Sequence, residues 1–180
     1  MSEPTTEANQ LPVEDVAVVA AATSVTEPPP TITEADKEAF FKCFLADAPF
    51  YYDQPLLNGK LVVKFKTLTV EESDDVFRQI NLDIKAEKAP KDDSYLQTIV
   101  QYRLGLSLAE INRQPFAPDL QKDKVAVEGN STYVSQRAAL LKQWPVPKLV
   151  AITDAFNDFE KKTSYLIDQA LNADFWKAAE

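Results

Sequence analysis

The chain has 180 residues, of which 45% are hydrophobic and 26% are charged, and its formal net charge is −9. It contains no histidine, one cysteine (Cys43) and three glycines. This composition excludes histidine-based catalysis, internal disulfides and cysteine metal clusters, and three scattered glycines cannot form a phosphate-binding loop.

The same composition limits the partners and the compartment that we expect. A chain with a net charge of −9 lacks the basic face that general binding to nucleic acid requires. The longest apolar run near the start, Val16 to Ala22, has no basic flank and is too short to span a membrane. We therefore expect a protein of a reducing cytoplasm that binds neither nucleic acid nor a membrane, with no catalytic residue, cofactor or metal ligand.

Residues 1–32 are rich in proline, threonine and glutamate and contain no lysine or arginine. Such a segment buries too little apolar surface to offset the entropy lost on ordering, so we predict a disordered tail. The apolar run Val16-Ala17-Val18-Val19 within it is either a slightly sticky linker or a short motif that orders on a partner. Residues 33–180 are long enough to form a single domain with its own core.

The domain is predicted to begin with a helix from about Glu34 to Asp47. Thr33, with Asp36 three residues later, caps the start of this helix, and Pro49 ends it. Large apolar residues at helical spacing are expected to face the core. These residues are Phe40, Phe41, Phe44 and Leu45.

A β-hairpin followed by a helix is predicted between Leu56 and Glu72. Asn58-Gly59 is the dipeptide best suited to a two-residue hairpin turn, because both residues tolerate a positive φ. The residues after the turn alternate between apolar and polar, as in a strand with one buried face. Its apolar residues are Leu61, Val63 and Phe65. Thr69 and Glu72 then form a capping box, which predicts a helix that runs to about Lys85. The expected apolar side of that helix is Val76, Phe77, Ile80 and Ile84.

A third helix is expected to begin within residues 92–94, after the break at Ala89-Pro90. Its apolar residues cover most of the circumference, so it should be the central helix of the domain. Arg103 falls between two apolar stripes of this helix. It is either an arginine that reaches along the surface to solvent or a buried arginine held by a carboxylate.

Residues Gln114 to Gly129 contain two prolines and are predicted to form a long loop. A fourth helix follows, capped within Asn130 to Thr132 and ended by Trp144-Pro145. Its aligned apolar residues are Val134, Ala138 and Leu141. The last helix begins near Pro147, because proline suits the first helical position.

The last helix carries an apolar seam at alternating spacings of three and four residues. The seam is Leu149, Ile152, Phe156, Phe159, Thr163, Leu166 and Ala170. It is either an ordinary core-facing stripe or a surface that pairs with another helix, from a second copy of the chain or from a different protein. Phe175 and Trp176 follow near the end, where large aromatics dock back on the domain or on a partner. The candidate partner-binding residues are therefore Leu149, Ile152, Phe156, Phe159, Leu166, Phe175 and Trp176.

Together these elements predict an α+β fold. The fold is expected to be a mainly helical single domain with one small antiparallel β-hairpin and a disordered N-terminal tail. We assign structural rather than chemical roles to Asn58, Gly59, Thr69, Glu72 and Arg103.

Several short motifs occur in a distinctive order. A phenylalanine-rich first helix precedes Ala48-Pro49-Phe50-Tyr51, and Asn58-Gly59-Lys60-Leu61 opens a strand that runs to the capped helix at Glu72. Gln101-Tyr102-Arg103-Leu104 lies in the middle helix, and Phe175-Trp176 lies near the end. This order resembles that of phage tail assembly chaperones, small proteins encoded beside the tape measure protein of long-tailed phages. The resemblance spans roughly residues 33–176 and does not include the tail.

The resemblance implies a non-enzymatic assembly factor of the host cytoplasm. Such proteins coat the long helical tape measure protein, keep it soluble and give way to the polymerising tail tube protein. A second class remains open, namely a permanent structural component of the virion in the tail, baseplate or connector. An enzyme is a third class, but no spacing in the sequence brings two carboxylates together beside a cleft.

Overall fold

The computed structural model describes residues 30–88, 94–120, 122 and 132–171. These residues form five helices and a four-stranded antiparallel sheet, so the predicted α+β class is confirmed. The elements in chain order are α1 (Glu34–Leu45), β1 (Tyr51–Leu56), β2 (Leu61–Lys66), α2 (Val70–Lys85), α3 (Ser94–Ser107), β3 (Leu108–Ile111), β4 (Gln114–Pro115), α4 (Tyr133–Leu141) and α5 (Val146–Ala170). Tail residues 1–29, and Phe175 with Trp176, lie outside the described residues.

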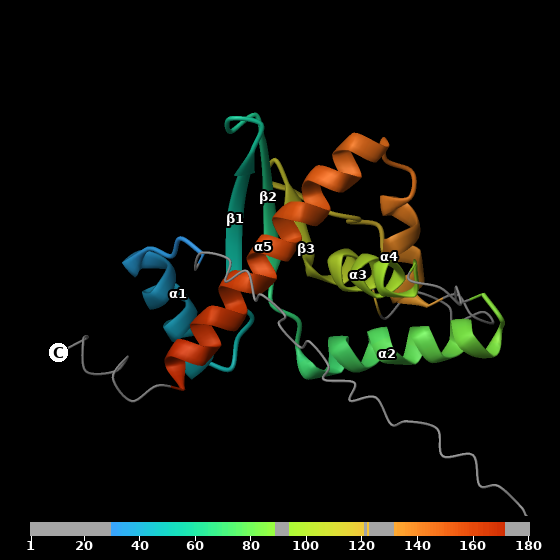
Figure 1. Cartoon of the computed structure of the whole chain (residues 1–180), viewed down its shortest axis with the longest axis horizontal. Coiled ribbons are helices and arrows are strands. Elements are labelled where there is room, and N and C mark those ends of the chain that lie inside the picture. The colour runs from blue at the N-terminus through green and yellow to red at the C-terminus, as the bar shows by residue number, and fades with distance from the viewer. Residues whose placement is uncertain (1–29, 89–93, 121, 123–131, 172–180) are drawn as a thin grey trace, which may run out of the picture.

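The long helix α5 crosses the sheet diagonally, with α1 beside its C-terminal half (Figure 1). Helices α2, α3 and α4 pack together on the other side of the molecule, and α3 contacts both of the others. Ile32, which the sequence placed in the tail, packs against the core that α5 forms with the sheet.

The sheet is larger than the single hairpin that the sequence predicts. Its strand order is β1-β2-β3-β4, and β3 pairs with β2 so that Val63 lies opposite Ile111. The last strand, β4, adds two residues from a segment predicted to be loop. The sequence hides β3 because this strand follows α3 without a break. Leu108 continues the apolar run of the helix, and in so short a segment the pattern does not separate helix from strand.

The predicted turn at Asn58-Gly59 and the predicted cap of α2 are confirmed, but the paired strands end at Leu56 and Leu61, so the turn comprises residues 57–60 rather than two residues. Asn58 and Gly59 have positive φ values of 55° and 81°, and the N–H of Lys60 donates to the carbonyl of Leu57 at 3.2 Å. At the other end of β2, the Thr69 hydroxyl accepts from the N–H of Glu72 at 3.2 Å. The Glu72 carboxylate accepts from the N–H of Thr69 at 3.1 Å, which completes the capping box.

Two predicted apolar faces are only partly buried. Phe40 is buried on α1, but Phe44 and Leu45, one turn later, are exposed. On α2, Val76 and Ile80 are buried whereas Phe77 and Ile84 are exposed. The expectation that these four exposed side chains face the core is wrong, because α1 and α2 lie at edges of the domain and have packed neighbours on one side only (Figure 1).

The central position of α3 is confirmed by the two clusters of buried apolar residues. One cluster lies between α5 and the sheet and includes Leu104 of α3. The other lies between α2, α3 and α4 and includes Tyr102 and Leu106. Alternate residues of the same helix therefore face different cores, which explains why its sequence is apolar over most of its circumference.

Phe159 of α5 lies at the centre of the first cluster. Its ring centroid is 5.6 Å from that of Phe65 on β2 and 6.3 Å from those of Phe50 and Tyr52. These rings come from three different parts of the chain, so their packing fixes α5 against the inner face of the sheet.

We predict that Phe159→Ala lowers the free energy of unfolding by about 3–5 kcal/mol, because the variant leaves a cavity among three aromatic rings. Val150→Ala, at an exposed position of the same helix, should change it by less than about 0.5 kcal/mol. Urea denaturation of both variants measures the difference. Equal losses in the two variants would show that α5 is not packed on the sheet in solution.

Candidate functional site

The apolar seam of α5 forms part of the core. Ile152, Phe156, Phe159 and Leu166 are each at most 2% exposed, and Leu149 packs against the same cluster. The expectation that these residues bind a partner is therefore wrong for the folded domain, because the sheet and α1 already cover them. Of the two alternatives for the seam, core packing is the one found.

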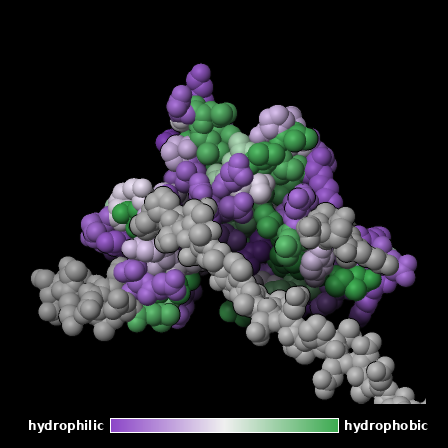
Figure 2. All heavy atoms as spheres, in the orientation of Figure 1, coloured by the Kyte–Doolittle hydropathy of each residue, from purple (hydrophilic) through white to green (hydrophobic). Residues whose placement is uncertain are grey.

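Exposed apolar side chains occur instead near the C-terminal ends of α1 and α5. This end patch consists of Phe44 and Leu45 of α1 and Ile167 and Leu171 at the end of α5, and these side chains are 44% to 79% exposed. The two helices contact each other, and Figure 2 shows hydrophobic surface at the lower left, where they end. Ile167 also lines the cleft between α5, α3 and the connection from β2 to α2. Phe40 holds α1 in place, since its buried ring lies 5.5 Å from that of Phe50.

A small polar cleft of about 230 Å³ opens between α5, α3 and the connection from β2 to α2. Three of the hydroxyl groups that line it bond within the domain. Ser107 donates to the carbonyl of Lys66 at 2.7 Å, and Thr67 accepts from the N–H of Phe50 at 2.9 Å. Thr163 donates to the carbonyl of Phe159 at 2.6 Å. The Ser107 bond connects α3 to β2, and Ser73 and Ser164 also line the cleft.

Arg103 forms one wall of this cleft. Its Nε donates to Oε1 of Glu160 at 3.0 Å, and Nη2 donates to the same oxygen. The Arg103 side chain is 40% exposed, so it is more than half covered and also reaches solvent. The predicted carboxylate partner is confirmed, and it links α3 to α5 in a pair that remains partly hydrated.

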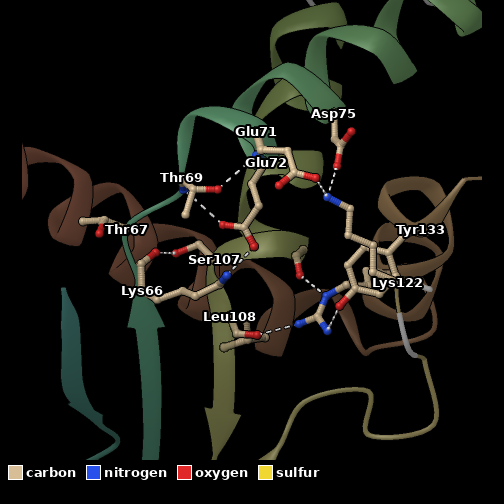
Figure 3. Close-up of polar contacts among 12 residues, drawn as sticks. Lys66, Thr67, Thr69, Glu71, Glu72, Asp75, Ser107, Leu108, Lys122 and Tyr133 are labelled. Atoms are coloured by element: carbon tan, nitrogen blue, oxygen red, sulfur yellow. Dashed lines mark hydrogen bonds and ion pairs between the residues drawn. The ribbon is translucent and has the colours of Figure 1, made fainter. Parts of the chain in front are cut away.

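Ionic contacts surround the start of α2 (Figure 3). Lys122 lies 2.6 Å from a carboxylate oxygen of Glu71 and 2.7 Å from one of Asp75. Hydrogen bonds to Asp75 and then to Glu71 raise the pKa of the Lys122 ammonium group. Lys66, at the end of β2, pairs with Glu72. These contacts tie the sheet and residue 122 to the first turn of α2, where carboxylates also interact favourably with the helix dipole.

A buried polar network joins α2, α3 and the start of α4. Gln79 donates to Oδ1 of Asp83 at 2.8 Å, and the hydroxyl of Tyr102 donates to Oδ2 of the same carboxylate. The hydroxyl of Thr132, the N-cap of α4, donates to Gln79 at 2.5 Å. Burial, followed by the hydrogen bond to Asp83, raises the pKa of Tyr102.

Arg137 of α4 is buried and bonds to backbone carbonyls rather than to a carboxylate. Its Nε donates to the carbonyl of Gly105 at 2.6 Å, and Nη2 donates to that of Leu108 at 2.7 Å. Nη1 donates to the carbonyl of Phe116 at 3.3 Å and to the hydroxyl of Tyr133 at 3.1 Å. The guanidinium also lies 4.9 Å from the centre of the Phe116 ring. Arg137 therefore satisfies the carbonyls where α3 ends and β3 begins.

Sequence reasoning missed Arg137 and the network around Asp83. A signal for Arg137 was present, because it lies three residues after Val134 and one before Ala138, on the predicted core side of its helix. The Asp83 network had no comparable signal. Its members come from three helices, and their proximity is a property of the fold.

Among the described residues, no group of three or more histidine, cysteine, aspartate and glutamate side chains could hold a metal ion. No helix in the described part of the chain has the length and apolar character needed to cross a membrane. No protein-family model matches the chain, and no curated protein or solved structure is significantly similar to it.

We predict that Arg137→Leu lowers the free energy of unfolding by about 3–5 kcal/mol, because several buried carbonyls lose their donor. Arg78→Leu is the control. The Arg78 side chain is 68% exposed and its partner Asp75 also pairs with Lys122, so this variant should cost less than about 1 kcal/mol. Thermal and urea unfolding compare the two. A small loss of unfolding free energy in Arg137→Leu would show that water or other donors satisfy the carbonyls that the guanidinium binds.

The Tyr102 network should give the stability a dependence on alkaline pH. Because the folded-state pKa of Tyr102 is raised, its stabilising effect is fully present below the unfolded pKa of about 10 and is lost as pH rises above it. Tyr102→Phe should cost about 1.5–3 kcal/mol near neutral pH. The difference in unfolding free energy between the wild type and Tyr102→Phe should shrink above pH about 10. Urea titrations across pH, with Tyr51→Phe as an exposed control, test this; a difference that stays constant above that pH contradicts it.

Proposed function

We propose that the protein is a non-enzymatic assembly factor that binds another protein through the end patch. The favoured client is a helical phage tail protein such as the tape measure protein, in line with the resemblance of the chain to tail assembly chaperones. The observation that supports this proposal most is the exposure of Phe44, Leu45, Ile167 and Leu171 near the C-terminal ends of α1 and α5, two helices that contact each other.

The end patch offers enough apolar surface for reversible binding. Burying one large apolar side chain contributes about 1.5–3 kcal/mol, so completing the burial of four such side chains suffices for about micromolar affinity after the costs of association. Reversible affinity suits a factor that holds a client and then releases it to a polymerising partner.

The edge strands and the exposed helices indicate which kind of client segment the protein would bind. Both edge strands of the sheet, β1 and β4, contain a proline, Pro55 and Pro115, and proline discourages the addition of a further strand. The exposed apolar side chains lie on helices instead, which favours an amphipathic helix as the bound element. Asp47 and Asp168 lie close in sequence to the patch, so lysine or arginine beside the apolar face of the client would complement it.

The test compares variants in the end patch with a variant at the opposite end of α5. Phe44→Glu with Leu171→Glu should abolish co-purification with a co-expressed tape measure protein and leave the melting temperature nearly unchanged, because both side chains are exposed. Val146→Glu, exposed at the opposite end of α5, is the matched control and should retain the client. Phe175→Ala with Trp176→Ala should weaken capture as well if these aromatics extend the surface. Capture that survives the Phe44 and Leu171 changes would place the binding surface elsewhere.

A permanent role in the virion is the alternative that must be separated from assembly. Mass spectrometry of purified virions distinguishes the two, because a chaperone should be absent from mature particles and a structural component should be present. Loss of complete tails in phage that carry the end-patch variant is expected for both functions.

A further inference from the structure

A second group of exposed apolar side chains lies on α2, on the side of the molecule away from α1. Val70, Phe77 and Ile84 are 50% to 80% exposed and occur at intervals of seven residues. Seven residues are close to two helical turns, so the three side chains form a row about 10 Å apart along one side of the helix. Figure 1 shows α2 at an edge of the molecule, on the side away from α1, with α3 and α4 packed on its other face.

The row is symmetric about Phe77. Val70 lies seven residues before it and Ile84 seven residues after it. When two copies of α2 lie side by side in opposite directions, Phe77 meets Phe77 at the two-fold axis and each Val70 meets the Ile84 of the other copy. A row with this spacing is therefore complementary to itself in an isologous pair.

The charges along α2 separate into two halves. The first half carries four acidic residues and no basic ones, namely Glu71, Glu72, Asp74 and Asp75. The second half and the residues just after it carry Arg78, Lys85 and Lys88, with two acidic residues, Glu87 and the buried Asp83. Lys122 neutralises part of the acidic half, but Asp74, Lys85 and Lys88 make no ion pair within the described part of the chain.

These charges decide between the two directions in which the rows can meet. A parallel pair would place acidic half on acidic half, whereas an antiparallel pair brings Lys85 of one copy near Glu71 and Asp74 of the other. We propose that the protein forms a two-fold dimer in which the α2 helices of two copies pack antiparallel through Val70, Phe77 and Ile84. The interface joins three apolar residues from each copy, which corresponds to a weak dimer with a dissociation constant in about the micromolar range.

We take the occupant of the row to be a second copy for two reasons. The apolar row is symmetric about Phe77, and the acidic half of one α2 helix faces the more basic half of the other in an antiparallel pair. The end patch lacks this symmetry, since its residues come from the ends of two different helices. Dimerisation through α2 would leave the α1 part of the end patch open, because α1 lies on the other side of the molecule, so each dimer would present two client surfaces and gain from binding a long client at two points.

The first experiment is sedimentation equilibrium of the purified chain from about 1 µM to about 1 mM, which spans the expected dissociation constant. The wild type should pass from monomer to dimer over this range. Phe77→Glu should weaken association by at least about tenfold, because it places two charges together at the axis. Phe44→Glu, in the end patch, is the matched control and should leave association unchanged. A wild type that stays monomeric throughout, or a dimer that survives Phe77→Glu, overturns the proposal.

The second experiment tests the direction of the helices. Asp74→Lys and Lys85→Glu should each weaken the dimer, because each removes an attraction to the opposite half of the other copy. The double variant restores opposite charges only in an antiparallel pair, so it should regain association close to that of the wild type. Circular dichroism checks that all variants remain folded. The antiparallel arrangement is contradicted if the single variants associate as strongly as the wild type, or if the double variant associates no more strongly than the single variants.

Discussion

The contact between Arg137 and the carbonyls of Gly105 and Leu108 supports the point where the chain changes from helix α3 to strand β3 with no residue between them. A helix end leaves carbonyls without partners inside the helix, and burial makes such groups costly. The guanidinium supplies several donors in a fixed plane, so one side chain of α4 satisfies carbonyls on both sides of the junction. Gly105 permits the close approach, because a Cβ there would lie 3.3 Å from the backbone nitrogen of Ala138.

Both cores depend on this junction. The segment from Tyr102 to Leu108 contributes side chains to the cluster under α2 and α4 and to the cluster between α5 and the sheet. The Asp83 network fixes one side of α3, and the pair between Arg103 and Glu160 fixes the other. Polar contacts thus set how α3 is placed, while burial of apolar surface supplies most of the stabilisation.

The apolar residues that remain exposed follow from the same arrangement. A central helix can be covered on every side, but α1 and α2 lie at edges and each has one face without a neighbour. Single exposed apolar residues are common on protein surfaces. Groups of them are unusual and often mark surfaces that bind other proteins. The two proposed interfaces, the end patch and the α2 row, lie on different helices, and α1 and α2 lie on opposite sides of the molecule (Figure 1).

The sequence by itself determined the features that depend on neighbouring residues. The Asn58-Gly59 turn, the Thr69 and Glu72 capping box, the alternating strand β2 and the extent of α2 and α5 all follow from local backbone preferences and periodicity. Tertiary structure decided the rest. The sequence could not show whether the α5 seam or the Phe44 and Phe77 positions would be covered, because burial depends on which elements pack against a face. Strand β3, the role of Arg137 and the Asp83 network likewise depend on contacts between segments distant in the chain, and periodicity carries no information about those.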